Sequence, residues 1–175
     1  MRRPAGDRLI TIRETDRMLV LSCEQFTYVF NKLTGLFDKM TFANEPLLDQ
    51  PMGFNVWRAP TDNDRKLKAD WYAAHYDHAA TNAYHTEYTV TASGVTLHTH
   101  VGIAAICVQK FLDLDVTWTV ANNGSVDLAL HAQRNTVFPE LPRFGLRLFL
   151  PQEMSQVNYY GMGPMECYCD KHHAA

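Results

Sequence analysis

Apolar and polar residues alternate along most of the chain, which is the pattern of β-strands that bury one face. The clearest run is Phe111–Ala121, where bulky apolar residues take nearly every second position and aspartate and threonine fill the others. Similar runs predict further strands at residues 9–12, 18–21, 26–31, 36–42, 84–92, 95–103, 126–133, 144–149 and 157–160. We therefore expect an all-β protein of antiparallel strands.

Turn-forming residues separate these strands. Asn122-Asn-Gly124 predicts a tight hairpin, because asparagine and glycine tolerate the positive φ that a two-residue turn requires. Gly35 is available for positive φ in the turn before residue 36, and Asn44–Gly53, which contains two prolines, is predicted as a loop. Only Leu67–Tyr76, with apolar residues at three- and four-residue spacing, is expected to form a short helix, inserted at the edge of the sandwich.

One stretch, Asn55–Asp64, concentrates charge and conformational constraint within ten residues. Its start is predicted as a short strand that ends near Arg58, because the proline at position 60 favours extended backbone before it. The side chains of Asp62, Asn63 and Asp64 can bond their own backbone, so a sharp turn follows. We expect Arg58 to be partly buried and paired with Asp62 or Asp64. The alternative to a binding site is a structural turn that satisfies itself.

Composition narrows the class of protein. A chain of 175 residues is long enough for one domain with its own core. The formal net charge of -3 without a basic patch argues against nucleic acid as a partner, and no apolar run reaches the roughly 18 residues of a membrane span. We expect a soluble, cytoplasmic protein with reduced cysteines, in which residues 1–7 are a basic leader or tag-like tail and residues 8–175 one sandwich domain.

Three groups of residues could in principle bind a metal, and the sequence favours none of them. His98 and His100 share one face of a strand, but no third ligand is apparent nearby, so a surface or cross-strand role is preferred. The other two groups are His75, His78 and His85 around the predicted helix, and Cys167, Cys169, His172 and His173 near the end of the chain.

Two motifs resemble one enzyme family. Arg58-Ala-Pro-Thr-Asp-Asn-Asp64 is similar to the Arg-Ala-Pro-x-Asp-Asn-Asp signature in the C-terminal β-sandwich of large, lacZ-type β-galactosidases, which is a separate small chain in two-chain relatives. The second motif has two parts: Leu141–Leu146 resembles the family's Leu-Pro-Arg-x-Gly segment, and Tyr159–Asp170 resembles its Gly-x-Gly-Pro-x-Glu-x-Tyr-x-Asp-Arg segment. Lys171 stands where the family has arginine, and the two cysteines occupy variable positions. The matched structural residues are Arg143, Gly163, Pro164, Glu166, Tyr168 and Asp170.

This resemblance implies a galactose mutarotase-like supersandwich that lacks its last strands. In the family, two catalytic glutamates lie in a separate (β/α)₈ barrel, so this segment is expected to have no catalytic residue and no activity alone. Arg58, Asp62, Asn63 and Asp64 are expected to hold a loop at the rim of the active site. The segment itself needs no cofactor, whereas the parent enzymes often use Mg and Na in the barrel. The implied partners are the remainder of the β-galactosidase, a terminal β-D-galactoside and further copies in a homo-oligomer.

Two other classes of protein remain open on the sequence. A free-standing carbohydrate-binding module needs an exposed aromatic platform, but Trp57, Trp71 and Trp118 are predicted within the motif, the helix and a strand core. An aldose epimerase would use a histidine acid and a carboxylate base. That interpretation requires His98, His100 or His131 to lie opposite a glutamate in one pocket.

Overall fold

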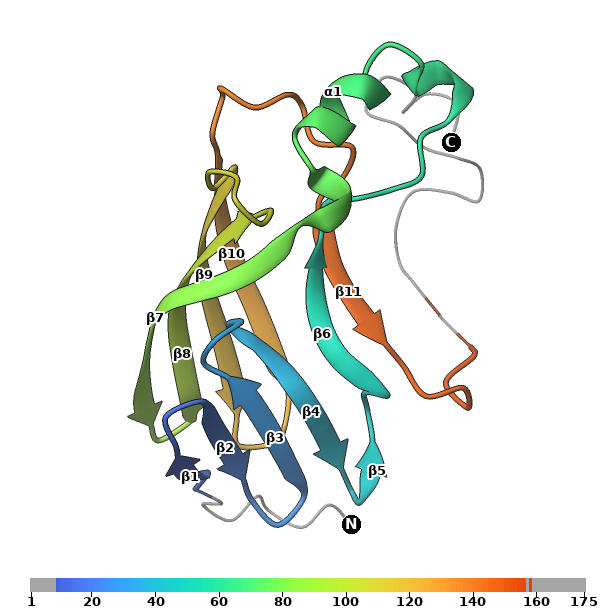
Figure 1. Ribbon diagram of the computed structural model, residues 1–175. Helices are drawn as coiled ribbons and strands as arrows, with labels where there is room; N and C mark the ends of the chain where they lie inside the picture. The colour runs from blue at the N-terminus through green and yellow to red at the C-terminus, as the bar shows by residue number, and fades with distance from the viewer. Residues whose placement is uncertain (1–8, 157, 159–175) are drawn as a thin grey trace, which may run out of the picture.

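The computed structural model describes residues 9–156 and residue 158, and these are arranged as antiparallel β-sheets (Figure 1). The first sheet contains, in spatial order, β1 (Thr11–Glu14), β2 (Met18–Ser22), β3 (Phe26–Asn31), β4 (Leu36–Phe42) and β5 (Glu45–Pro46). The second contains β7 (Ala80–Thr91), β8 (Gly94–Ala104), β9 (Leu112–Ala121) and β10 (Val126–Arg134). A third pairs β6 (Gln50–Asn55) with β11 (Gly145–Phe149). The prediction of an all-β protein is confirmed.

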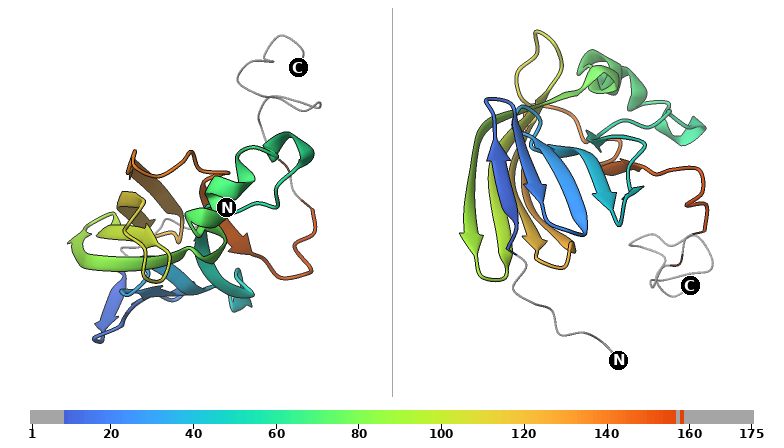
Figure 2. Two further views of the ribbon diagram at one scale, coloured as in Figure 1. Left: turned by 45° about the horizontal axis from the view of Figure 1, so that its top comes forward. Right: turned by 90° about the horizontal axis from the view of Figure 1, so that it is seen from below.

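The two large sheets face each other, as the views in Figure 2 show, and the core lies between them. On β9 the alternation seen in the sequence is the alternation of burial, with Leu112, Leu114, Val116, Trp118 and Val120 all buried. The indole Nε1 of Trp118 donates a hydrogen bond to the carbonyl of Gly35, 3.0 Å away, and the Trp118 ring packs edge-on against Phe37 at 5.2 Å. Tyr28 from the first sheet donates to the carbonyl of Gly124 at 2.7 Å. The hairpin turns are therefore points where one sheet is bonded to the other.

A helical segment lies at one end of the sandwich (Figure 1). It consists of the 3₁₀-turn η1 (Asp62–Asp64), the helix α1 (Lys68–Ala73) and the 3₁₀-turn η2 (Tyr76–His78). The helix predicted over Leu67–Tyr76 is present but shorter, because His75 adopts a left-handed conformation with φ of 56° that an α-helix cannot continue through. Buried Trp71 and Tyr76 fasten the segment to the sheets.

The predicted loop at Asn44–Gly53 is wrong in part. The structure places β5 and most of β6 within it. Strand β5 is a two-residue edge strand, where a proline costs no ladder hydrogen bond. Strand β6 pairs with β11, about 90 residues later in the chain, so no local pattern could have indicated its partner. Of the strand predicted at Val157–Tyr160, only Asn158 is among the described residues, and it is not assigned to a strand, so the prediction is not tested.

Gly35 provides a test of how tightly the sheets approach each other. Its φ is +73°, and a Cβ built there would lie 2.7 Å from a methyl carbon of Val101 in the opposite sheet. We expect Gly35→Ala to lower the free energy of unfolding by about 1–3 kcal/mol, from left-handed strain and the clash together. Urea unfolding of the two proteins measures this difference.

Gly145→Ala is the matched control, because a Cβ at Gly145 in β11 meets nothing within 4 Å and its φ is not positive. That change should alter the free energy of unfolding by no more than about 0.5 kcal/mol. Equal effects of the two substitutions would show that the space between Gly35 and Val101 can expand at no cost.

Candidate functional site

The site begins where β6 ends. The side-chain amide of Asn55 donates to the carbonyl of Trp57 at 3.0 Å and accepts from the Trp57 N–H at 3.3 Å. These local bonds replace sheet pairing, so the strand ends at Asn55 and not near Arg58 as the sequence predicts. The chain then crosses from the sheet into the turn that carries the charged residues.

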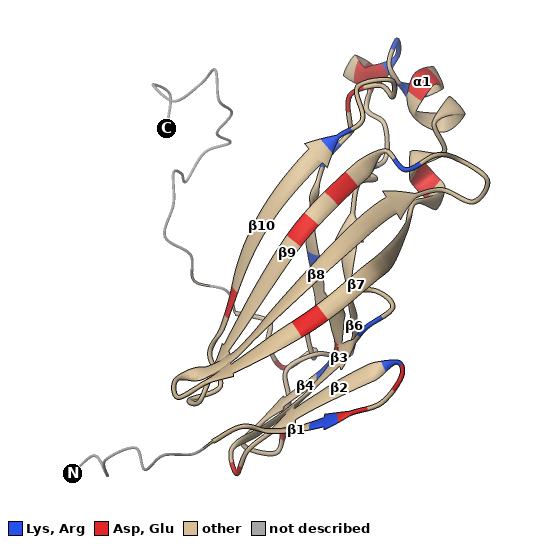
Figure 3. Cartoon of the chain, turned by 90° about the vertical axis from the view of Figure 1, so that its left-hand side faces the viewer, with Lys and Arg blue, Asp and Glu red and all other residues tan. Residues whose placement is uncertain are grey.

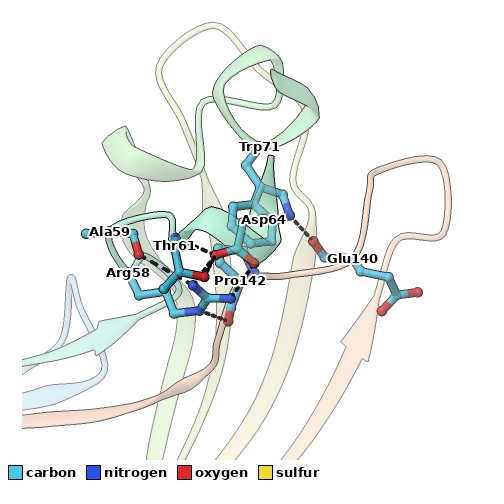
Figure 4. Close-up of polar contacts among 7 residues, drawn as sticks. All are labelled: Arg58, Ala59, Thr61, Asp64, Trp71, Glu140 and Pro142. Atoms are coloured by element: carbon cyan, nitrogen blue, oxygen red, sulfur yellow. Dashed lines mark hydrogen bonds and ion pairs between the residues drawn. The ribbon is translucent and has the colours of Figure 1, made fainter. Parts of the chain in front are cut away.

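An ion pair between Arg58 and Asp64 closes that turn (Figure 4). The guanidinium donates from Nη1 to Oδ2 at 2.5 Å and from Nη2 to Oδ1 at 2.8 Å, which is the paired geometry of a strong arginine–carboxylate contact. Thr61 adds two more hydrogen bonds to Oδ2, from its backbone N–H at 2.7 Å and its hydroxyl at 3.0 Å. Asp64 therefore accepts four hydrogen bonds from the turn that it terminates.

Burial and charge act together on Asp64. Its side chain is only 8% exposed, whereas that of Arg58 is 35% exposed. The hydrogen bonds from Arg58, followed by those from Thr61, hold the pKa of the Asp64 carboxyl far below its ordinary value of 3.8 and outweigh the effect of burial. Asp64 is thus ionised at neutral pH.

The same guanidinium joins the two motifs that lie 84 residues apart. Arg58 Nε donates to the carbonyl of Pro142 at 3.1 Å, in the segment that leads into β11. The guanidinium carbon lies 5.1 Å from the ring centre of Trp71, whose Nε1 donates to the carbonyl of Glu140 at 2.9 Å (Figure 4). Arg58 therefore contacts the η1 turn, the helix α1 and the Leu-Pro-Arg segment at once.

Two further bonds hold the segment before Pro142. Tyr76 in η2 donates to the carbonyl of Pro139 at 2.7 Å. Arg134, at the end of β10, donates to the carbonyl of Phe138 at 2.7 Å and to a carboxylate oxygen of Glu140 at 2.9 Å. In an ordinary surface loop, backbone carbonyls are bonded to water. Here the carbonyls of residues 138–140 accept hydrogen bonds from side chains of β10 and the helical segment, so the path of the loop is defined.

The structure describes some of the predicted site residues and not others. Arg58 and Asp64 are brought together, while Asp62 and Asn63 are exposed on the same turn, and Asp64 rather than Asp62 is the partner of Arg58. Arg143 is exposed and lines a pocket of about 280 Å³ with Asn55 and residues of β11. The other motif residues, together with the cysteines and histidines near the end of the chain, lie outside the described residues: Gly163, Pro164, Glu166, Cys167, Tyr168, Cys169, Asp170, Lys171, His172 and His173.

The tryptophans do not form an exposed platform for a sugar. Trp71 and Trp118 are each 2% exposed. Trp57 is half-buried and packs against Tyr72 with the two rings inclined at 57°, so they present no common plane. This arrangement argues against a free-standing carbohydrate-binding module.

Sequence reasoning missed Thr61, Trp71 and Pro142 as members of the site. Thr61 could have been found, because a threonine three residues before an aspartate is a known capping pattern at the start of a helical turn. The contacts of Trp71 with Arg58 and Glu140 depend on how distant segments pack, and nothing in the local sequence indicates them.

The histidine and carboxylate groups do not form a ready metal centre. Within the described part of the chain, no set of three or more His, Cys, Asp or Glu residues is close enough to hold an ion as the side chains stand. His98 does lie opposite a glutamate, Glu87, and both line a shallow depression. Because the Glu87 side chain is 67% exposed, this pair lacks the enclosed surroundings that tune an acid and a base for catalysis.

An antiparallel β-sandwich that carries these two motifs in this order agrees with the family that the sequence resembles. Residues 22–175 match the family model described as beta galactosidase small chain. The chain belongs to this family.

Full-length relatives carry the same name. The chain is 39% identical over 151 residues to a β-galactosidase of Actinobacillus pleuropneumoniae, a match that covers 86% of the chain and 15% of the relative. It is 35% identical over 163 residues to one from Staphylococcus xylosus, covering 93% of the chain and 16% of that protein. A third, from Pseudoalteromonas haloplanktis, is 27% identical over 186 residues. The chain thus spans only about a sixth of the length of the curated relatives it matches.

No helix in the described part of the chain is long and apolar enough to cross a membrane.

Removing Arg58 should loosen the turn and the Pro142 segment together. We expect Arg58→Ala to lower the Tm by roughly 5 °C or more, because it leaves the mostly buried Asp64 charge without its partner. Arg65→Ala is the control, since Arg65 is an exposed arginine in the same turn, and it should shift the Tm by about 1 °C or less. Differential scanning calorimetry measures both, and a double-mutant cycle with Asp64→Ala should show strong coupling, whereas one with Asp62→Ala should not.

The ion pair should also make stability depend on pH in the acid range. A depressed folded-state pKa stabilises the folded chain fully above the ordinary value of 3.8, and this contribution is lost as the pH falls through the folded-state pKa. Between about pH 5 and pH 2, the free energy of unfolding should therefore fall more steeply for the wild type than for Asp64→Asn. Parallel curves for the two proteins would contradict the assignment of Asp64.

Proposed function

We propose that this chain is a non-catalytic sandwich segment of a β-galactosidase that hydrolyses terminal β-D-galactosides, and that it supports the rim of an active site carried by a separate barrel domain. The observation that carries the proposal is the joining of the two family motifs through Arg58, combined with a match to about a sixth of each full-length relative. A segment of this kind contributes position, and the rest of the enzyme contributes the reacting groups.

The state of Asp64 supports a structural role for the motif. A retaining glycosidase needs one carboxyl group that is protonated near neutral pH to act as an acid, and a second that is free to attack the sugar. Asp64 is ionised, and its oxygens are already held by Arg58 and Thr61. It can serve neither role without dismantling the turn.

The exposed half of the turn supports the position at the rim. Asp62 and Asn63 are exposed and sit beside the fixed Arg58–Asp64 pair, so a carboxylate and an amide are presented from a rigid support. Such groups can hold a neighbouring loop or a sugar hydroxyl in place at little entropic cost. We propose that these two residues face the remainder of the enzyme near its active site.

The proposal extends to partners and location. The partners are the remainder of the β-galactosidase, further copies of the whole enzyme in a homo-oligomer, and the galactoside through the assembled site. Cofactor ions of the hydrolysis belong to the barrel and not to this segment. The cytoplasm is the proposed location, on the composition of the sequence.

The first test is activity. The purified chain, produced in a host without its own β-galactosidase, should not hydrolyse an aryl β-galactoside, because it lacks the two barrel carboxylates. It should also leave the rate of galactose mutarotation, followed by polarimetry, at the rate of buffer alone. Hydrolysis by the chain itself would overturn the proposal, and faster mutarotation would favour the aldose epimerase alternative, to which the Glu87–His98 pair points.

The second test uses a chimera. Residues 22–175 of this chain would replace the matching segment of the Actinobacillus pleuropneumoniae β-galactosidase. The chimera should turn over substrate, Arg58→Ala within it should reduce kcat/KM by about tenfold or more through misplacement of the rim, and Arg65→Ala should not. A folded chimera whose activity is indifferent to Arg58 would contradict the role at the rim.

A further inference from the structure

A cluster of imidazoles and carboxylates lies on the face of the four-stranded sheet that points away from the core. On β8 the odd-numbered residues from Val95 to Ile103 are buried, which places His98 and His100 on the outer face. Figure 3 shows this sheet, with acidic positions coloured red on β7 and β9, and the sequences of β7, β8 and β9 contain no lysine or arginine. We call it the histidine face and define it by His85, Glu87, His98, His100, Asp115 and Thr117.

Strand register brings four of these residues into a block. His85 is the cross-strand partner of His100, and Glu87 is the partner of His98. Directly opposed residues have Cβ atoms about 5 Å apart, and residues two apart on one strand share a face. Two neighbouring strands therefore present three imidazoles and one carboxylate at the corners of a small rectangle.

A β-bulge creates this arrangement. The register shifts between Ala83 and His85, so that Tyr84 is an extra residue in β7. Without the shift, His85 would lie opposite the buried Thr99 and point toward the core. The hydroxyl of Thr99 donates to the carbonyl of His85 at 2.9 Å and bonds the Thr86 hydroxyl at 3.0 Å, which holds the bulge from inside.

The side chains leave ligand atoms available around a depression of about 310 Å³. Nδ1 of His98 bonds the hydroxyl of Thr117 at 3.0 Å, so the bond that orients this ring is made by the nitrogen other than Nε2. Nε2 of His85 lies 3.6 Å from a carboxylate oxygen of Glu87. An imidazole fixed through one nitrogen and free at the other is the usual state of a metal-binding histidine.

His100 completes the surroundings of the depression. Its ring nitrogens lie 3.0 Å from Asp115 and 3.1 Å from Asp113, and Lys110 forms an ion pair with the same Asp113. Because both of its nitrogens are engaged, His100 is held in place next to the other three residues without itself being an available ligand. Asp115 and Asp113 add negative charge beside a cation site.

We propose that His85, Glu87 and His98 bind a divalent transition-metal ion of the zinc class. Two imidazole nitrogens and one carboxylate are a ligand set that Zn²⁺ accepts with water in the fourth position. None of the residues that define the histidine face is a cysteine, whereas the segment from Cys167 to His173 contains two. The two candidate metal sites therefore differ in whether thiolate ligands are present.

Binding requires small rotations of exposed side chains. As they stand, no three ligating residues in the described ranges are at coordination distance, so the ion must draw the ligands together. His85 is 72% and Glu87 67% exposed, and neither rotation disturbs the core. We expect an affinity weaker than that of a preformed zinc site, in about the micromolar range, because part of the binding free energy is spent on ordering these side chains.

The ion would act as a cross-strand link. Strand β7 is the edge of its sheet, and most of its residues are exposed. A metal shared by His85 and Glu87 on β7 and His98 on β8 would stabilise this edge. The Tm of the chain should therefore rise with added Zn²⁺.

The test is isothermal titration calorimetry with Zn²⁺ on the full chain, in which Cys167→Ser, Cys169→Ser, His172→Asn and His173→Asn remove the competing ligands near the C-terminus. One ion per chain is expected, with an affinity weakened at least about tenfold by either His85→Gln or His98→Gln. His78→Gln is the matched control, because His78 is also 72% exposed and also lies beside a carboxylate, that of Asp77. It should bind as the parent does.

Two readouts keep the result independent of folding. The Tm measured without metal identifies any variant that has lost structure. If the His85 or the His98 variant has done so, the Zn²⁺ affinity of Glu87→Gln is compared with that of the parent instead. Co²⁺ bound in the same background should absorb in the visible range without a thiolate charge-transfer band. Absence of micromolar binding, or equal binding by the His85 and His98 variants and the parent, overturns the proposal.

Discussion

The ion pair of Arg58 and Asp64 is the interaction on which the end of the sandwich that carries the helical segment depends. One guanidinium satisfies a mostly buried carboxylate, donates to Pro142 and lies over Trp71. Each contact fixes a different segment, so the turn, the helix and the approach to β11 are placed by a single side chain. Lysine could not substitute, because a single ammonium group lacks the fork that bonds a carboxylate twice and a carbonyl once.

The sequence predicted those features of the fold that depend on residues close together in the chain. Strict alternation over residues 111–121 predicted β9, and Asn122-Asn-Gly124 predicted the hairpin that connects it to β10. The pairing of Arg58 with a carboxylate was accessible because the partners are six residues apart. Strand β6 was missed because its partner β11 follows about 90 residues later, and the bond to Pro142 was missed for the same reason.

The histidine face shows the same division between spacing and register. Sequence spacing places His98 and His100 on one face of a strand, but their neighbours across the sheet depend on the bulge at Tyr84. A one-residue difference in register moves a side chain to the opposite face of a sheet. The proximity of His85 and Glu87 to His98 is therefore a property of the folded sheet that no count along the sequence could supply.

The chemistry that holds a turn together need not be the chemistry of catalysis, and Asp64 illustrates why. A carboxylate that accepts four hydrogen bonds is strongly stabilised as an anion, which makes it a poor proton donor and an unavailable nucleophile. The same bonds make it a good support, because each restricts the turn that carries Asp62 and Asn63. Rigidity at Asp64 and exposure at the two preceding residues are thus complementary: the buried end of the turn determines where its exposed end can act.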